Sequence, residues 1–168
     1  YYTDSLLLTF DATVATCEPV GDRFHVTLDQ SAFYPTSGGQ PHDIGTLQNV
    51  VGASRVNVVD VIDDEASGEV VHVVDAALAP GAAVHGEVER LRRLDHMQQH
   101  TGQHVLSAAF DQIAGARTVS FHMGAESSTI DLAREVTPEQ IAMVESAANA
   151  LVWRDRELVV RYVSEAEA

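Results

Sequence analysis

The sequence predicts an α+β protein in which a small β-barrel domain over residues 1–90 is followed by an α+β domain over residues 91–168. Branched and aromatic residues alternate with a period of two from Leu6 to Val88, which is typical of strands with one buried face. From about Arg90 the apolar pattern becomes helical, and helix, hairpin, helix and strand follow in that order. The 168 residues are enough for one ordinary core or two small ones.

Short strands account for most of the first domain. The alternation is clearest at Phe24, Val26 and Leu28. Similar runs recur over residues 6–10, 56–58, 70–74 and 84–88, and turn residues separate them at 21–22, 63–64, 67–68 and 80–81. Strands of this length and spacing indicate a small barrel or a sandwich, and we predict the barrel.

A helix and a hairpin open the second domain. Asp95 with Gln98 three residues later forms a capping box, and Gly115 provides a C-cap, so the pattern predicts a helix between Asp95 and Gly115. We expect a hairpin over residues 118–132 with its turn at Gly124.

A second helix has the clearer start signal. Thr137 is the expected N-cap, Pro138 occupies the first helical position, and Gln140 completes a capping box, so we expect a helix that ends at about Trp153. Residues 157–163 alternate again and predict a last strand.

The composition predicts a soluble acidic protein. The chain has 25 Asp and Glu against 10 Lys and Arg, a formal charge of −15. No stretch reaches the roughly 20 apolar residues of a membrane span and no leader opens the chain, so we expect a cytoplasmic protein with no membrane partner. Cys17 is the only cysteine, which excludes an internal disulfide and an all-cysteine zinc site within one copy. Because the chain starts at Tyr1, we expect the native polypeptide to extend further on at least one side.

Three histidines spaced four apart, His96, His100 and His104, form the strongest chemical pattern. On a helix each step of four residues turns about 40° and rises about 6 Å, so two of the imidazoles can share one zinc ion. On spacing alone, a solvated or hydrogen-bonded polar face is an equal alternative. A complete site needs further ligands, for which His42 and His122 are available, whereas a lone cysteine in strands is more often a buried apolar residue.

A glycine-rich loop over residues 33–45 is the second pattern. Adjacent Gly38 and Gly39 let a backbone approach a ligand closely, while Thr36 and Gln40 offer hydroxyl and amide groups. The loop lacks both phosphate-binding glycine motifs and suits a small polar ligand. A structural turn between two barrel strands is at least as good a hypothesis from this segment alone.

Three segments in order carry a family resemblance. They are residues 33–41 (FYPTSGGQP), residues 92–93 with 100–107 (RR and HTGQHVLS), and residues 127–132 (SSTIDL). With them, the chain resembles the editing domain of alanyl-tRNA synthetase and its free-standing relatives, the AlaX proteins, over essentially its whole length. The resemblance implies the α+β editing fold that alanyl- and threonyl-tRNA synthetases share.

The resemblance implies that the protein is an aminoacyl-tRNA deacylase. Its substrate would be tRNA(Ala) charged by mistake with serine, or in some members glycine, at the 3′ end. In this family Thr36 would sense the serine hydroxyl, with Gln40 and the Gly38–Gly39 backbone shaping the pocket. The sequence names no general base.

The resemblance also implies one zinc ion. His100 and His104 match the first half of the family's ligand set, and no residue here matches the second half, a later cysteine and histidine. We therefore expect the native chain to continue past Ala168 and zinc to be weakly held or absent in these 168 residues, and an inactive deacylase is an open alternative. His96 lies one turn earlier on the helix. It would either hydrogen-bond to a metal ligand or carry a proton. The alternative is an exposed helical histidine without a catalytic part.

The net charge of −15 is the main objection to a tRNA substrate, since an acidic protein repels a polyanion. Arg92 and Arg93 are the candidates for a local tRNA contact, with a solvated stretch as the alternative. The second functional hypothesis is a non-catalytic tRNA or aminoacyl-ligand binding module with an incomplete metal site. The third is an acidic globular protein whose histidine face has no role.

Overall fold

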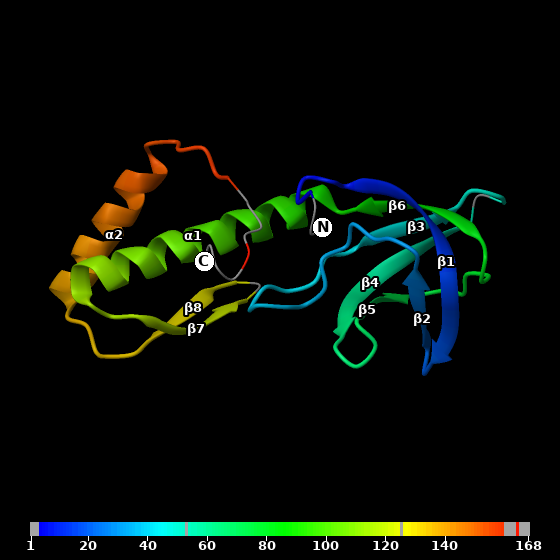
Figure 1. Cartoon of the computed structure of the whole chain (residues 1–168), viewed down its shortest axis with the longest axis horizontal. Coiled ribbons are helices and arrows are strands. Elements are labelled where there is room, and N and C mark those ends of the chain that lie inside the picture. Colours follow the sequence, from blue (N-terminus) through cyan, green and yellow to red (C-terminus); the bar gives the residue numbers. More distant parts are fainter. Residues whose placement is uncertain (1–3, 53, 125, 160–163, 165–168) are drawn as a thin grey trace. The chain divides into compact units, whose positions relative to one another are not determined.

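The computed structural model describes residues 4–52, 54–124, 126–159 and 164. It is an α+β structure with a closed six-stranded antiparallel barrel and two helices (Figure 1). The chain forms two compact units, which we call unit 1 (Tyr1–Thr101 and Phe121–Thr129) and unit 2 (Gly102–Ser120 and Ile130–Ala168). The division of the sequence into domains at residue 90 stays a prediction.

The barrel, expected from the period-two pattern, is confirmed. Its strands follow the spatial order β1-β2-β5-β4-β3-β6, and β6 closes onto β1. The strands are β1 (Thr9–Val20), β2 (Arg23–Leu28), β3 (Gly45–Asn49), β4 (Arg55–Asp64), β5 (Glu69–Val74) and β6 (Ala83–Val88). The sequence did not predict β3, because Leu47 is its only buried residue and one apolar position makes no alternation.

Alternate residues of these strands fill the barrel. Val26, Val58, Val74 and Val84 are almost completely buried and belong to one core cluster. The aromatic ring of Phe10 lies over Gly86, where an added Cβ would come within 2.3 Å of the ring. A strand glycine is therefore required here by the close approach of a neighbouring side chain.

Helix α1 (Arg90–Ala114) begins five residues earlier than expected. The carboxylate of Glu89 accepts hydrogen bonds from the backbone N–H groups of Leu91 (3.0 Å) and Arg92 (2.6 Å), so Glu89, and not Asp95, satisfies the first free donors of the helix. The expected C-terminal glycine is confirmed, since Gly115 has a φ of 59° and its N–H donates to Asp111 O.

The remaining elements follow the order that the sequence predicts. Strands β7 (Thr118–Met123) and β8 (Ser128–Leu132) form the hairpin, and α2 (Pro138–Val152) has the complete capping box of Thr137 and Gln140. Residues 157–159 lie outside any strand, and most of the last expected strand lies outside the described residues. Neither described helix is long and apolar enough to span a membrane.

Candidate functional site

The tip of the glycine loop is a two-residue turn within unit 1. The backbone groups of Ser37 and Gln40 exchange hydrogen bonds of 3.1 and 2.9 Å. Gly38 and Gly39 between them have φ values of 57° and 79°. Two successive positive φ values are the requirement of the tight hairpin turns in which glycine is preferred.

Gly39 is also held against the end of β7. Its carbonyl accepts a hydrogen bond from the N–H of Met123 at 3.0 Å. A Cβ on Gly39 would lie 2.6 Å from the backbone oxygen of Phe121, which no side chain tolerates. The glycine that the sequence assigned to ligand approach is thus required for the approach of another backbone segment.

Gln40 brings the glycine loop and helix α1 together. Its side chain is buried, and its carbonyl oxygen Oε1 lies 2.8 Å from Nδ1 of His100. Because an amide oxygen only accepts, Nδ1 of His100 donates, and in the neutral ring the lone pair is then on Nε2. Metal-ligating histidines are commonly oriented in this way, by a hydrogen bond to the second ring nitrogen.

Thr36 is exposed, but its hydroxyl is already engaged within the loop. Oγ1 accepts a hydrogen bond from the backbone N–H of His42 at 3.1 Å, and Nδ1 of the same histidine lies 3.1 Å away. Asp60 Oδ1 lies 3.0 Å from that Nδ1. The sequence did not predict that His42 and Asp60 would lie beside Thr36. Asp60 is 24 residues from Thr36 and 18 residues from His42 in the sequence.

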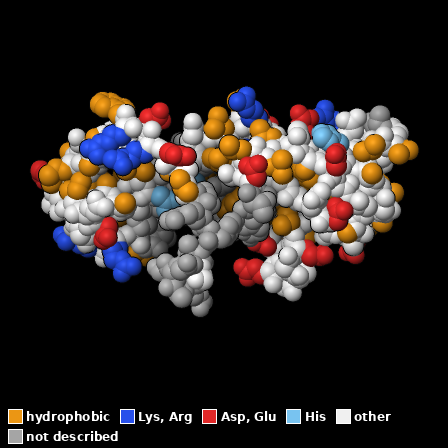
Figure 2. All heavy atoms as spheres, turned by 45° about the horizontal axis from the view of Figure 1, so that its top comes forward, with side chains coloured by type: hydrophobic (Ala, Val, Ile, Leu, Met, Phe, Trp, Pro, Cys, Tyr) orange, Lys and Arg blue, Asp and Glu red, His pale blue; other side chains and the backbone are white. Residues whose placement is uncertain are grey.

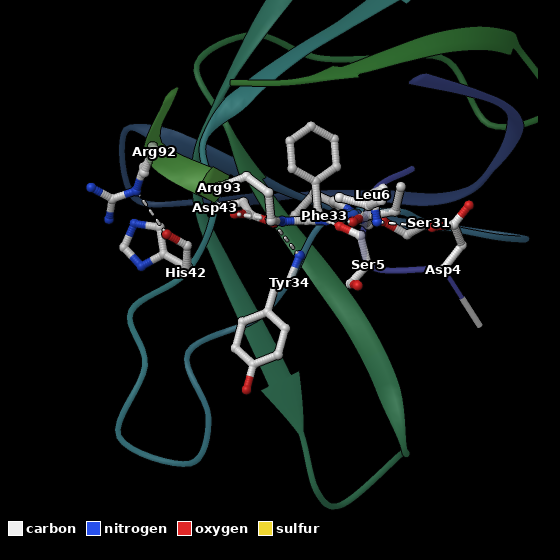
Figure 3. Close-up of polar contacts among 12 residues, drawn as sticks. Asp4, Ser5, Leu6, Ser31, Phe33, Tyr34, His42, Asp43, Arg92 and Arg93 are labelled. Carbon is white, nitrogen blue, oxygen red and sulfur yellow. Dashed lines mark hydrogen bonds and ion pairs between the residues drawn. The ribbon is translucent and has the colours of Figure 1, made fainter. Parts of the chain in front are cut away.

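Arg93 is the centre of a buried polar cluster beneath the loop, shown in Figure 3. Its guanidinium pairs with the buried carboxylate of Asp43 and also donates to the backbone oxygens of Ser5 (2.8 Å) and Ala32 (2.5 Å). Asp43 Oδ2 accepts from the N–H of Tyr34 at 2.7 Å. These bonds fasten both ends of the loop to the start of α1.

This placement corrects the expected tRNA contact at Arg93. The side chain is 4% exposed and its nitrogens are occupied by protein oxygens, so it is not presented to a ligand. Arg92 donates from Nε to the backbone oxygen of His42 at 2.9 Å (Figure 3). Its side chain is partly exposed. Of the pair, only Arg92 retains access to solvent.

His96 is buried, so the prediction of an exposed helical histidine is wrong. It lies in the part of α1 that belongs to unit 1, and the residue is 6% exposed. Burial lowers the pKa of His96, and the nearby Arg92 lowers it further, while Asp43 and Asp95 act in the opposite direction. Among the described residues, Nδ1 of His96 has no hydrogen-bond partner.

Within the described ranges no group of three or more His, Cys, Asp or Glu side chains is arranged to hold a metal ion. Cys17 packs partly buried against the barrel core, and its Sγ accepts from the N–H of Leu78 at 3.4 Å. His122 is exposed on β7, and His42 is held by Thr36 and Asp60. The described residues thus give His100 the orientation of a ligand but form no complete metal site.

Known proteins match this chain over most of its length. The family model described as "tRNA synthetases class II (A)" matches residues 6–92. The "Alanyl-tRNA editing protein AlaX-M" of Methanosarcina barkeri is 33% identical over 174 residues, covering 100% of this chain and 70% of that protein. The "Alanine--tRNA ligase" of Pyrobaculum neutrophilum is 38% identical and covers 100% of this chain and 19% of the ligase.

A similar match extends to animals. The "Alanyl-tRNA editing protein Aarsd1" of Mus musculus is 35% identical over 167 residues, which are 91% of this chain. The chain spans only 38% of the length of that protein.

Proposed function

Because the chain belongs to the family of alanyl-tRNA synthetase editing domains and alanyl-tRNA editing proteins, we propose that it edits tRNA(Ala) by hydrolysing a wrongly attached aminoacyl ester. The proposed substrate is Ser-tRNA(Ala), with Gly-tRNA(Ala) as a further one, and the proposed location is the cytoplasm. The names of the relatives support editing in general. The observation that carries the proposal is the 2.8 Å contact of Gln40 with His100, which joins the glycine loop to the histidine helix.

Serine differs from alanine by one hydroxyl group, and the proposed site selects for that group. A site built to hydrogen-bond a hydroxyl rejects the analogue without it, because polar groups that the bound substrate covers would be left unpaired. We assign this contact to Thr36, with Gln40, Gly38 and Gly39 shaping the pocket. The exposure of Thr36 leaves room for a substrate to reach it.

We further propose that His100 and His104 provide two ligands of a zinc ion. The hydrogen bond from His100 Nδ1 to Gln40 supports this, because it leaves the lone pair of the neutral ring on Nε2. A bound zinc ion would polarise an ester carbonyl or lower the pKa of a water molecule. The family's cysteine and histidine ligands have no counterpart in the 168 residues.

Contact with tRNA requires positive charge on a chain of net charge −15. We propose Arg92 for this contact, because its side chain is partly exposed and donates a 2.9 Å hydrogen bond to the backbone oxygen of the loop residue His42. Arg93 is excluded from the proposal by its burial with Asp43.

The test is release of serine from Ser-tRNA(Ala), with Ala-tRNA(Ala) as the control substrate, with and without added zinc. We expect serine release that falls at least about tenfold in His100→Ala and Thr36→Val. His85→Ala is the matched control, since His85 is an exposed barrel histidine paired with Asp11 and lies outside the loop. Serine release that is unchanged in His100→Ala and Thr36→Val would contradict the assignment of the site.

One observation favours the second hypothesis, a binding module without hydrolysis. The described residues supply no third metal ligand beside His100 and His104. A binding module predicts an intact ester under every zinc condition together with retention of tRNA(Ala) on a filter. Loss of that retention in Arg92→Ala, but not in the ion-paired Arg55→Ala, would support Arg92 in either case.

A further inference from the structure

The hydroxyl of Thr36 contacts two nitrogen atoms of a single residue, His42. The backbone N–H of His42 donates to Oγ1 at 3.1 Å, and the imidazole Nδ1 of His42 lies at the same distance from Oγ1. The same Nδ1 also lies 3.0 Å from Oδ1 of Asp60. Three side chains of unit 1 thus form a row that ends at the proposed serine sensor.

Strand β4 fixes both ends of this row. The register of β4 shifts between Val58 and Asp60, a bulge of the kind that redirects a side chain. The N–H of Val61 donates to Asp60 Oδ1 at 2.8 Å, and the N–H of Thr36 donates to Val61 O at 3.1 Å. Asp60 and Thr36 are therefore held by the same strand residue.

The carboxylate decides where the proton of the imidazole lies. An ionised carboxylate only accepts, and a lone pair on Nδ1 at 3.0 Å from Asp60 Oδ1 would be repelled, so Nδ1 carries a hydrogen. Nδ1 of His42 has a single hydrogen, and of its two contacts only the one with Thr36 Oγ1 has hydrogen-bond geometry, while Asp60 lies at an ion-pair distance. With that hydrogen directed at Thr36, Oγ1 accepts from both N–H groups of His42, which uses both of its lone pairs. The only hydrogen-bonding group that the threonine has left is its own O–H hydrogen.

We propose that His42 and Asp60 are positioning residues that make Thr36 an obligate hydrogen-bond donor to the aminoacyl group of the substrate. The matching ligand group is an acceptor oxygen on the β-carbon, as in a seryl ester. An alanyl ester, which has no oxygen on its β-carbon, would leave that O–H without a partner, which weakens its binding. The inference rests on the proposed function for its substrate, but the polarity of the Thr36 hydroxyl is a property of the protein alone.

The first test is therefore independent of activity. Nitrogen-15 NMR of the imidazole rings at pH 7.5 reports which ring nitrogen of His42 carries the proton. We expect a protonated Nδ1 in the unmodified protein and a shift toward the Nε2–H tautomer in Asp60→Asn, because an amide can donate to Nδ1. Asp11→Asn is the matched control, since it changes another histidine–aspartate pair of the barrel unit, His85 with Asp11 at 2.7 Å, away from the loop.

An unprotonated Nδ1 of His42 in the unmodified protein overturns the proposal, and so does a His42 tautomer that Asp60→Asn leaves unchanged. Asp11→Asn must leave the His42 signals as they are. This result stands even if the protein releases no serine, in which case the proposed function fails and the NMR spectra still decide the polarity of Thr36.

The second test is a double-mutant cycle on serine release. Asp60→Asn should lower kcat/KM for Ser-tRNA(Ala) by about fivefold, the loss expected for one hydrogen bond, and leave the rate on Ala-tRNA(Ala) unchanged. In the Thr36→Val background the same substitution should have no further effect, and Thr36→Ser, which keeps the hydroxyl, should restore the dependence on Asp60. An equal loss with Thr36 intact and in the Thr36→Val background would show that Asp60 acts only on the loop structure and would overturn the proposal.

Discussion

The two units of the molecule bury apolar surface to very different extents. Among the described residues, unit 1 has a core cluster of 14 buried residues, whereas the cluster of unit 2 consists of Ala109, Phe110 and Val144. Helix α2 buries only Val144 and exposes Met143 and Val152. A site that depends on hydrogen-bond geometry therefore has a rigid support in the barrel, while α2 depends on its caps and on few side-chain contacts.

The units also differ in charge. The described part of unit 1 has 16 acidic and 5 basic residues, and that of unit 2 has 7 acidic and 4 basic residues. The four arginines in the described part of unit 2 are all exposed, namely Arg117, Arg134, Arg154 and Arg156. On the face in Figure 2, blue arginine side chains accordingly gather over the helical part. The acidity of the chain is thus mainly a property of the barrel unit.

The largest effect should come from the buried ion pair of the barrel unit. Arg93→Ala leaves the Asp43 carboxylate buried without its partner, which costs about 3–5 kcal/mol of folding free energy. Urea unfolding followed by circular dichroism measures this loss. Arg55→Ala is the control, because the Arg55–Glu87 pair is more than half exposed on both sides and should cost less than about 1 kcal/mol. Equal losses in the two variants would refute a structural role for Arg93.

Acid should weaken the barrel through His72. This ring is buried in the core, where Nδ1 lies 3.0 Å from Val26 O and Nε2 lies 2.7 Å from Ser31 Oγ. Burial lowers the pKa of His72 to about 4 from its ordinary 6.5, so the unfolded chain binds the proton first as the pH falls. Stability is full above pH 6.5 and declines toward pH 4, by about 3 kcal/mol.

The measurement is the free energy of unfolding at pH 7.5 and at pH 4.5. His72→Leu should be less stable at pH 7.5, because Val26 O and Ser31 lose their partner, but it should lose most of the pH dependence between these values. The part that remains is expected from His96, whose pKa is also lowered by burial. An unchanged slope in His72→Leu would contradict the assignment.

The next effect concerns the loop that the barrel supports. Gly39→Ala places a Cβ 2.6 Å from the Phe121 oxygen at a positive φ and should cost about 2 kcal/mol, with a displaced loop and weaker serine release. Gly38→Ala is the matched control. It has a positive φ as well, but its nearest neighbour is the hydroxyl of Tyr34 at 3.9 Å, so about 1 kcal/mol is expected. Similar activity in both variants would mean that contact with β7 does not hold the loop.

Local signals account for the parts of the fold that the sequence predicted. The capping box of Thr137 and Gln140 and the C-terminal Gly115 depend on neighbouring residues, and both are confirmed. The start of α1 was missed because the carboxylate of Glu89 replaced the expected cap at Asp95. Glu89 and Asp95 are both local cap candidates, and the helix begins at the earlier of the two.

Nonlocal pairing explains what the sequence could not predict in the site. Asp43 and Arg93 are 50 residues apart, and only the folded barrel shows that they share a buried cluster. The same holds for Asp60, which reaches His42 through a shift in the register of β4. Motifs indicated Thr36, Gln40 and His100 as chemically important, whereas the residues that orient them have no motif.

The smallest effect on stability should come from the N-cap of α2, in the less buried unit 2. The hydroxyl of Thr137 accepts from the N–H of Gln140 at 3.3 Å, and the Gln140 side chain accepts from the N–H of Thr137 at 3.0 Å. Thr137→Ala removes the first of these bonds and should cost about 1 kcal/mol. Because α2 buries a single residue, this loss should appear as local opening, with faster amide hydrogen exchange over residues 138–152 and unchanged exchange in the barrel strands. Thr137→Ser keeps the cap and should restore the protection, whereas faster exchange in the barrel as well would mean that the two units unfold together.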